Sequence, residues 1–210
     1  MYITDPIVDL GHIESVSYLK LENTEEIISY PRQVKTLYIR SWNGNNLWLP
    51  HNLEKFVCRR STFTSLPELP TSLKTLDCAY NDLNSLPELP EGLINLICDH
   101  NKLTSLPKLP EGLEELLCND NKLTSLPELP SSLRILFCDK NNIEELPTLP
   151  DSLFNIEVDK KLQPHYSIPV AVYLKLLQKN NKLENENREY KKLQELDIGN
   201  IIYQTGKKYI

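Results

Sequence analysis

The chain of 210 residues lacks a long hydrophobic run: no stretch of about 18 apolar residues is present, so the sequence predicts no membrane-spanning helix. Its first residues, MYITDPIVDLGHIE, contain acidic side chains where a secretory signal has a basic and then an apolar segment. We therefore expect a cytoplasmic protein without a membrane partner.

An excess of basic charge is also missing. The net charge is −6, and the lysines and arginines are mixed with acidic residues along the chain. Because phosphate binding needs a basic stripe, this balance disfavours a nucleic-acid partner. Apolar residues make up 40% of the chain, which is enough for the continuous core of one folded domain.

Motifs of the common enzyme classes are absent from the sequence. It has no Gly-rich phosphate loop, no zinc-ligand spacing and no serine-nucleophile elbow. His100 follows Cys98 closely, but a catalytic Cys/His pair needs an exposed thiolate and an orienting acid. We therefore expect no enzymatic activity, no cofactor and no metal.

What the sequence does contain is a 20-residue repeat, with the pattern xxLxxLxCxxNxLxxLPxLP over residues 51–150. Such a period is typical of solenoids, and we count five strong copies and about three degenerate ones that would cap the stack. The repeated cysteines are Cys58, Cys78, Cys98, Cys118 and Cys138. The degenerate copies place apolar residues at the same offsets, namely Val16, Leu19 and Leu21, then Val34, Leu37 and Ile39, and finally Leu153, Ile156 and Val158.

Each repeat reads as one short strand, a turn and an extended return. Leu76 and Cys78 are two residues apart, which is strand spacing, so both should point inward and Asp77 outward. The cysteine is a small apolar group in the core, and unpaired thiols suit a reducing compartment. An asparagine follows each strand where freed backbone groups need partners, which predicts a buried polar ladder of Asn81, Asn101, Asn121 and Asn141.

The LPxLP segments resemble the shortest class of leucine-rich repeats, found in the IpaH and YopM families of bacterial effectors; similar repeats occur in large DNA viruses of amoebae. The resemblance covers roughly residues 34–158. It implies an α/β solenoid: a right-handed superhelix with one parallel sheet on its concave face and an extended, polyproline-like convex side. For an effector or viral protein, the compartment would be the host cytoplasm. IpaH proteins also carry a ubiquitin-ligase domain with a C-x-D nucleophile motif, but the C-x-D starting at Cys118 lies inside a repeat, which makes the match accidental.

We divide the chain into an N-terminal segment or cap (1–15), the solenoid (16–160) and a mostly helical C-terminal cap or tail (161–210). The first segment shows no clear pattern and is either a cap or partly disordered. In the last, Ser167 can cap a helix with Pro169 in its first turn. The apolar face of that helix would cover the open end of the solenoid and is formed by Val170, Tyr173, Leu174 and Leu177.

The outward residues of the sheet are the candidate binding site. Ile97, Leu117 and Phe137 lie on consecutive strands with Ile135 beside them, and such an apolar patch marks a partner site unless the C-terminal tail covers it. The next column is basic toward the N-terminus and acidic toward the C-terminus, which would steer a partner of complementary charge or be an ordinary solvated face. Calcium between strands is a further alternative for Asp99, Asn119, Asp139 and Asp159.

The sequence thus predicts a non-catalytic interaction module that binds a protein or peptide, such as a host protein, on the concave face. Two alternatives stay open: the substrate-recognition part of a ubiquitin ligase supplied in trans, and a structural component that assembles through edge or end contacts. The predicted partner-binding residues are Tyr38, Arg40, Lys55, Val57, Arg59, Ile97, Asp99, Leu117, Asn119, Ile135, Phe137 and Asp139.

Overall fold

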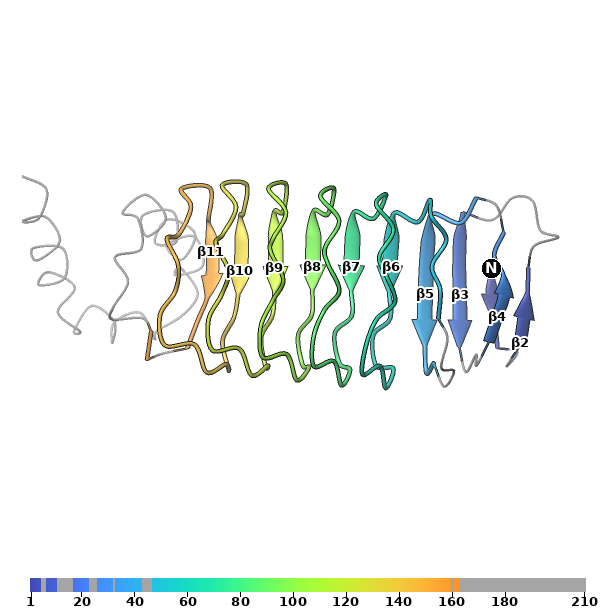
Figure 1. Ribbon diagram of the computed structural model, residues 1–210, viewed down its shortest axis with the longest axis horizontal. Helices are drawn as coiled ribbons and strands as arrows, with labels where there is room; N and C mark the ends of the chain where they lie inside the picture. Colours follow the sequence, from blue (N-terminus) through green and yellow to red (C-terminus); the bar gives the residue numbers. More distant parts are fainter. Residues whose placement is uncertain are drawn as a thin grey trace, which may run out of the picture. The chain divides into compact units, whose positions relative to one another are not determined.

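A parallel β-sheet runs through the repeats in the computed structural model (Figure 1). The structure describes residues 1–4, 7–10, 17–22, 26–31, 33–42, 47–159 and 161–162. In these ranges the sheet has nine strands, each repeat contributing one that pairs with the next. In order they are β1 (Tyr2–Ile3), β3 (Tyr18–Glu22), β5 (Thr36–Arg40), β6 (Lys55–Val57), β7 (Thr75–Asp77), β8 (Asn95–Ile97), β9 (Glu115–Leu117), β10 (Ile135–Phe137) and β11 (Asn155–Glu157).

The register of the sheet follows the repeat. Leu76 pairs with Leu96, its equivalent in the next strong repeat, and Leu96 pairs in turn with Leu116. Toward the N-terminus Tyr18 pairs with Thr36 and Thr36 with Lys55, so these units are one or two residues shorter. The strands end before the cysteine, but the pairing continues: the Cys98 N–H donates to Leu117 O at 2.8 Å.

The core is a stack of leucine columns between the sheet and the return segments. Leu73, Leu76, Cys78 and Leu83 of one repeat are fully buried, and their equivalents in the other strong repeats are buried too. This confirms the inward direction predicted for the leucine and cysteine positions. Because each interior unit buries both of its sides, every such leucine contributes roughly 1.5–3 kcal/mol of burial free energy.

The return segments contain no helix in any repeat that the structure describes, as the LPxLP pattern predicts. Proline lacks an N–H and favours extended backbone, so the return uses few backbone hydrogen bonds. The last proline of each unit accepts the bond that closes the turn into the next strand, as Pro90 O does from Leu93 N at 3.0 Å. No helix within the described ranges is long and apolar enough to cross a membrane.

The first repeats carry a second, two-stranded sheet of β2 (Ile7–Asp9) and β4 (Glu26–Ser29). Trp48 links this sheet to the following turn: its indole N–H donates to Ile27 O at 3.0 Å, and its own carbonyl accepts from the Tyr30 hydroxyl at 2.9 Å. The rings of Tyr30 and Trp48 meet edge to face, with centroids 4.6 Å apart. Sequence analysis did not identify β1 and β2 in the segment 1–15.

The chain divides into two compact units, Met1–Gln163 and Pro164–Ile210. The second unit lies outside the described residues, and so does the predicted helical cap with Ser167 and Pro169. Val16, the first apolar position of the earliest degenerate repeat, is outside them as well.

Candidate interaction surface

We use the term outer face for the side of the nine-stranded sheet that points away from the leucine core. Side chains alternate along each strand, so Leu116 points into the core while Glu115 and Leu117 belong to the outer face. The residues just after the inward cysteine continue this face into the turn. The outer face corresponds to the concave face of the sequence prediction.

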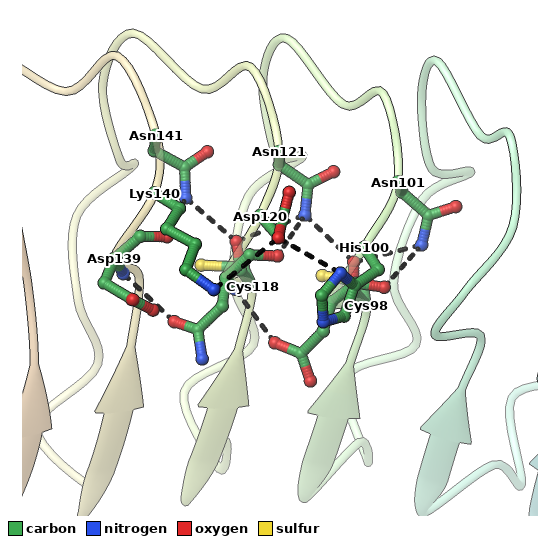
Figure 2. Close-up of polar contacts among 11 residues, drawn as sticks. Cys98, His100, Asn101, Cys118, Asp120, Asn121, Asp139, Lys140 and Asn141 are labelled. Carbon is green, nitrogen blue, oxygen red and sulfur yellow. Dashed lines mark hydrogen bonds and ion pairs between the residues drawn. The ribbon is translucent and has the colours of Figure 1, made fainter.

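The asparagine ladder fixes the turn that follows each strand (Figure 2). The Asn101 Nδ2 donates to Cys98 O at 3.1 Å in its own repeat and to Cys78 O at 3.0 Å in the preceding one. Its Oδ1 accepts from Leu83 N at 3.1 Å. Asn81, Asn121 and Asn141 make the equivalent bonds. One amide per repeat therefore satisfies backbone groups of two adjacent units.

The residue before each ladder position adopts a left-handed backbone conformation without being glycine. Tyr80 has φ of 59° and His100 has φ of 53°. Such a conformation costs roughly 1 kcal/mol or more for a side chain with a Cβ, and the ladder bonds hold it in place. No glycine marks this column in the sequence; its members are Ser41, Arg60, Tyr80, His100, Asp120 and Lys140.

The side chains of this left-handed column touch one another along one edge of the outer face. The rings of Tyr80 and His100 stack with centroids 4.2 Å apart, and the Arg60 guanidinium lies 5.3 Å from the Tyr80 ring centre. His100 Nδ1 lies 3.2 Å and Lys140 Nζ 3.8 Å from Asp120 Oδ2. Figure 2 marks both contacts with dashed lines. Consecutive repeats are thus linked side chain to side chain, which sequence analysis did not anticipate.

The column of Asp99, Asn119 and Asp159 binds backbone rather than pointing free into solvent. Asp99 Oδ1 accepts from Asn119 N at 2.9 Å, and Asn119 Oδ1 accepts from Asp139 N at 3.0 Å. Asp159 accepts from the N–H groups of Lys140 at 2.9 Å and Asn141 at 3.1 Å. Burial raises the pKa of Asp99 above its ordinary value, although the Asn119 N–H opposes the shift. These bonds use some of the oxygens that the calcium alternative would need, and the described residues contain no group of three His, Cys, Asp or Glu placed for a metal.

At the N-terminal end of the face the basic residues already have partners. Arg59 Nε lies 2.6 Å from both carboxylate oxygens of Asp77, whose side chain is almost buried, and this hydrogen bond raises the pKa of Arg59. Lys55 Nζ lies 5.8 Å from the centre of the Tyr38 ring. The Arg40 guanidinium is 3.9 Å from Glu22.

The predicted apolar patch lies on β8, β9 and β10, toward the C-terminal end of the sheet. Ile97 pairs with Leu117 and Leu117 with Phe137, so the three side chains are immediate neighbours on β8, β9 and β10. Each is half-buried, as is Ile135 beside them. Val57 is different: it is buried, and Asp77 with its bound Arg59 separates it from the patch. We use the term apolar patch for Ile97, Leu117, Ile135 and Phe137.

Acidic residues border this patch toward the C-terminus. Phe137 pairs with Glu157 on β11, and Asp139 follows Phe137 by two residues. Glu115 is engaged, since it accepts from the Asn95 amide at 2.8 Å. Within the described part of the chain, the carboxylates of Asp139 and Glu157 make no hydrogen bond or ion pair.

The cysteines lie on the opposite side of the sheet from this patch. All five are free and buried, and burial raises the pKa of each thiol, that of Cys138 to about 12. His100 contacts Tyr80 and Asp120 rather than the fully buried Cys98. Cys118, the first residue of the C-x-D match, is also fully buried. A nucleophilic role for these thiols therefore has no geometric support.

Comparisons with known proteins point to one group. No family model matches the chain, and no curated protein matches it in sequence. YopM from Yersinia enterocolitica WA-314 is 31% identical with a TM-score of 0.59, and the match covers 68% of this chain and 37% of YopM. The leucine-rich effector YopM from Yersinia pestis is 27% identical with a TM-score of 0.52, covering 73% and 49%.

A Shigella effector LRR domain is 43% identical over 46% of this chain and 44% of that one, with a TM-score of 0.46. The chain therefore spans less than half the length of each of these structures. Both YopM matches agree with the parallel solenoid described above and with its repeat pattern. The described repeats are leucine-rich repeats, similar in sequence and fold to those of the YopM effectors.

Proposed function

We propose that the chain is a non-catalytic interaction module that binds a protein or peptide at the apolar patch of its outer face. Leucine-rich-repeat folds of this type are typically protein-interaction modules. The observation that carries the proposal is the adjacency of Ile97, Leu117 and Phe137 on three consecutive strands, on the face away from the core. A contiguous apolar group of this kind marks a partner site.

The size of the patch limits what it does alone. Three parallel strands place the outer two about 10 Å apart, which fits one side of a helix or a short extended peptide. A stable interface usually needs roughly 800 Å² on each partner, so the polar columns must contribute the remaining contacts. Phe137 would be the anchor of the site, because buried aromatic side chains carry much of the binding free energy at interfaces.

The chemistry of the described residues supports a binding role over catalysis. The thiols are buried with raised pKa values, and the one Cys/His combination singled out in the sequence is not formed. The matched structures are repeat proteins of a kind that generally serves as a non-catalytic scaffold. Five unpaired cysteines suit a reducing compartment, so we propose the cytoplasm as its place of action and a host protein as its partner.

A photo-crosslinking map tests the proposal. Binders are selected from a displayed library of protein fragments and peptides on the full-length chain, and a photoreactive amino acid then replaces either Leu117 on the outer face or the exposed Glu128 on a return segment. We expect the selected binders to crosslink from position 117 and not from position 128. Crosslinking from position 128 alone would refute the outer face as the binding site.

A further inference from the structure

We propose that the apolar patch accepts a cationic amphipathic segment, with an apolar side chain on Ile97 and Leu117 and an arginine or lysine beside Phe137. The cation would lie between the carboxylates of Asp139 and Glu157. This inference rests on the proposed function and names the chemistry of the partner that the outer face selects.

The first support is the placement of the two acids around the aromatic ring. Glu157 is the register partner of Phe137 on the adjacent strand β11, about 5 Å away across the sheet. Asp139 lies on the same side of the chain as Phe137, because the residue between them, Cys138, points inward and is fully buried. The ring thus has one carboxylate across the sheet and another two residues further along the chain, both without a partner among the described residues.

The second support comes from the residues at the equivalent positions on the earlier strands β5 and β7. Tyr38 occupies the column of Phe137, and the chain's own Lys55 lies over its ring. Asp77 occupies the same column and binds the chain's own Arg59. At each of these two positions, a cationic side chain of the same chain interacts with the aromatic or acidic residue.

No such cation is supplied at Phe137. Among the described residues no Lys or Arg lies over its ring, and the position equivalent to Arg59 in the repeat of β10 is Asp139. Lys140 follows directly, but its ammonium group lies 3.8 Å from the carboxylate of Asp120. A cation from a partner would therefore complete the arrangement that Lys55 and Arg59 complete elsewhere.

The chemistry favours arginine in particular. A guanidinium can stack on an aromatic face and donate paired hydrogen bonds to a carboxylate at the same time. An acidic partner would place like charges beside Asp139 and Glu157, and the electrostatic repulsion would weaken binding. An uncharged apolar segment would bury two carboxylates without satisfying them.

The test uses a displayed library of random 16-residue peptides selected on the full-length chain. We expect the enriched peptides to combine Arg or Lys with aromatic or aliphatic residues and to carry net positive charge. Fluorescence anisotropy then measures individual enriched peptides against the wild type and the near-isosteric variant Asp139→Asn/Glu157→Gln. Affinity should fall at least tenfold. The matched control Glu88→Gln/Glu128→Gln removes the same charge from exposed return-segment positions and should change affinity less than twofold.

Phe137→Asp separates this site from non-specific attraction to an acidic protein. The substitution adds negative charge, so non-specific binding of a cationic peptide would strengthen, whereas the proposed site predicts at least tenfold weaker binding. Enriched peptides that are neutral or acidic yet depend on Phe137 would overturn the cationic partner and leave the outer-face function standing. Peptides that bind all variants equally would overturn both.

Discussion

The side-chain amide of Asn101 donates a hydrogen bond to the carbonyl oxygen of Cys78, 3.0 Å away in the preceding repeat. Its oxygen accepts the Leu83 N–H of that same preceding repeat. One buried side chain thus supplies both a donor and an acceptor to a neighbouring unit. The outer face depends on this arrangement, because the ladder holds the turn through which the chain leaves each strand.

Asn101→Ala should lower the free energy of unfolding by about 1–3 kcal/mol, because the buried Leu83 N–H would lose its acceptor. The Cys78 and Cys98 carbonyls would each lose one of the two asparagine amides that donate to them. Urea denaturation monitored by circular dichroism measures the change. Asn81→Ala and Asn121→Ala should behave alike. A mutant with the stability of the parent would show that these bonds do not support the stack.

Ser61→Ala provides the contrast within the same column. Ser61 stands where the following repeats have asparagine, and its buried hydroxyl has no hydrogen-bond partner among the described residues. Its backbone N–H donates to Asn81 Oδ1 at 3.1 Å, a bond that alanine keeps. Removing an unsatisfied buried hydroxyl should therefore leave the stability unchanged or raise it by up to about 1 kcal/mol. A clear loss of stability in the urea melt would mean that the hydroxyl has a stabilising partner.

Arg59→Glu should destabilise the fold as well as change the surface charge. The substitution replaces the Arg59–Asp77 ion pair with two carboxylates, one of them that of the almost buried Asp77. We expect the free energy of unfolding to fall by about 1–3 kcal/mol. The control Arg60→Glu changes the same charge at an exposed neighbouring position and should cost less. If both variants melt alike at low and high salt, the Arg59–Asp77 contact contributes nothing to stability.

The repeat period made most of the fold predictable from the sequence. Leucine and cysteine at strand spacing fixed the inward positions, and the absence of helix in the returns followed from LPxLP. The strands β1 and β2 escaped detection because the first units are shorter than 20 residues and carry few leucines. The left-handed column escaped because Tyr80 and His100 are not residues that signal a positive φ as glycine does.

The candidate site was predictable only in outline. The direction of Ile97, Leu117 and Phe137 followed from the inward cysteine after each of them. The bonds between residues of this face could not be predicted from the sequence. Arg59 and Asp77, or Asp99 and Asn119, are pairs whose spacing alone does not indicate a bond. Any covering of the patch by residues 163–210 lies outside the described part of the chain.

Because the thiols are buried, we predict that they react slowly with thiol reagents at neutral pH and that the protein loses stability in alkali. Their pKa values are higher in the folded protein than the value near 9 in the unfolded chain. Their contribution to the free energy of unfolding is therefore fully present below pH 9 and declines as the pH rises. For Cys138 the decline continues to its folded pKa of about 12. The slope is about 1.4 kcal/mol per pH unit for each thiol that titrates only on unfolding.

Two measurements check this behaviour. A thiol reagent should label the native protein slowly and the denatured protein at all five cysteines. Cys138→Ala should show a shallower decline of stability between about pH 9 and 12 than the parent. Fast labelling of several native thiols, or identical alkaline slopes, would contradict the burial described for this column.

The most direct test of the outer face as the interaction surface is a paired measurement on Phe137→Asp, in which one selected binder is titrated and the same preparation is melted in urea. We predict a loss of about 2 kcal/mol or more in binding, roughly 30-fold in Kd, because an anchor side chain is removed. The free energy of unfolding should change by no more than about 0.5 kcal/mol, since the side chain lies on the face away from the core. Unchanged affinity, or a variant that unfolds, would show that the outer face around Phe137 is not the interaction surface.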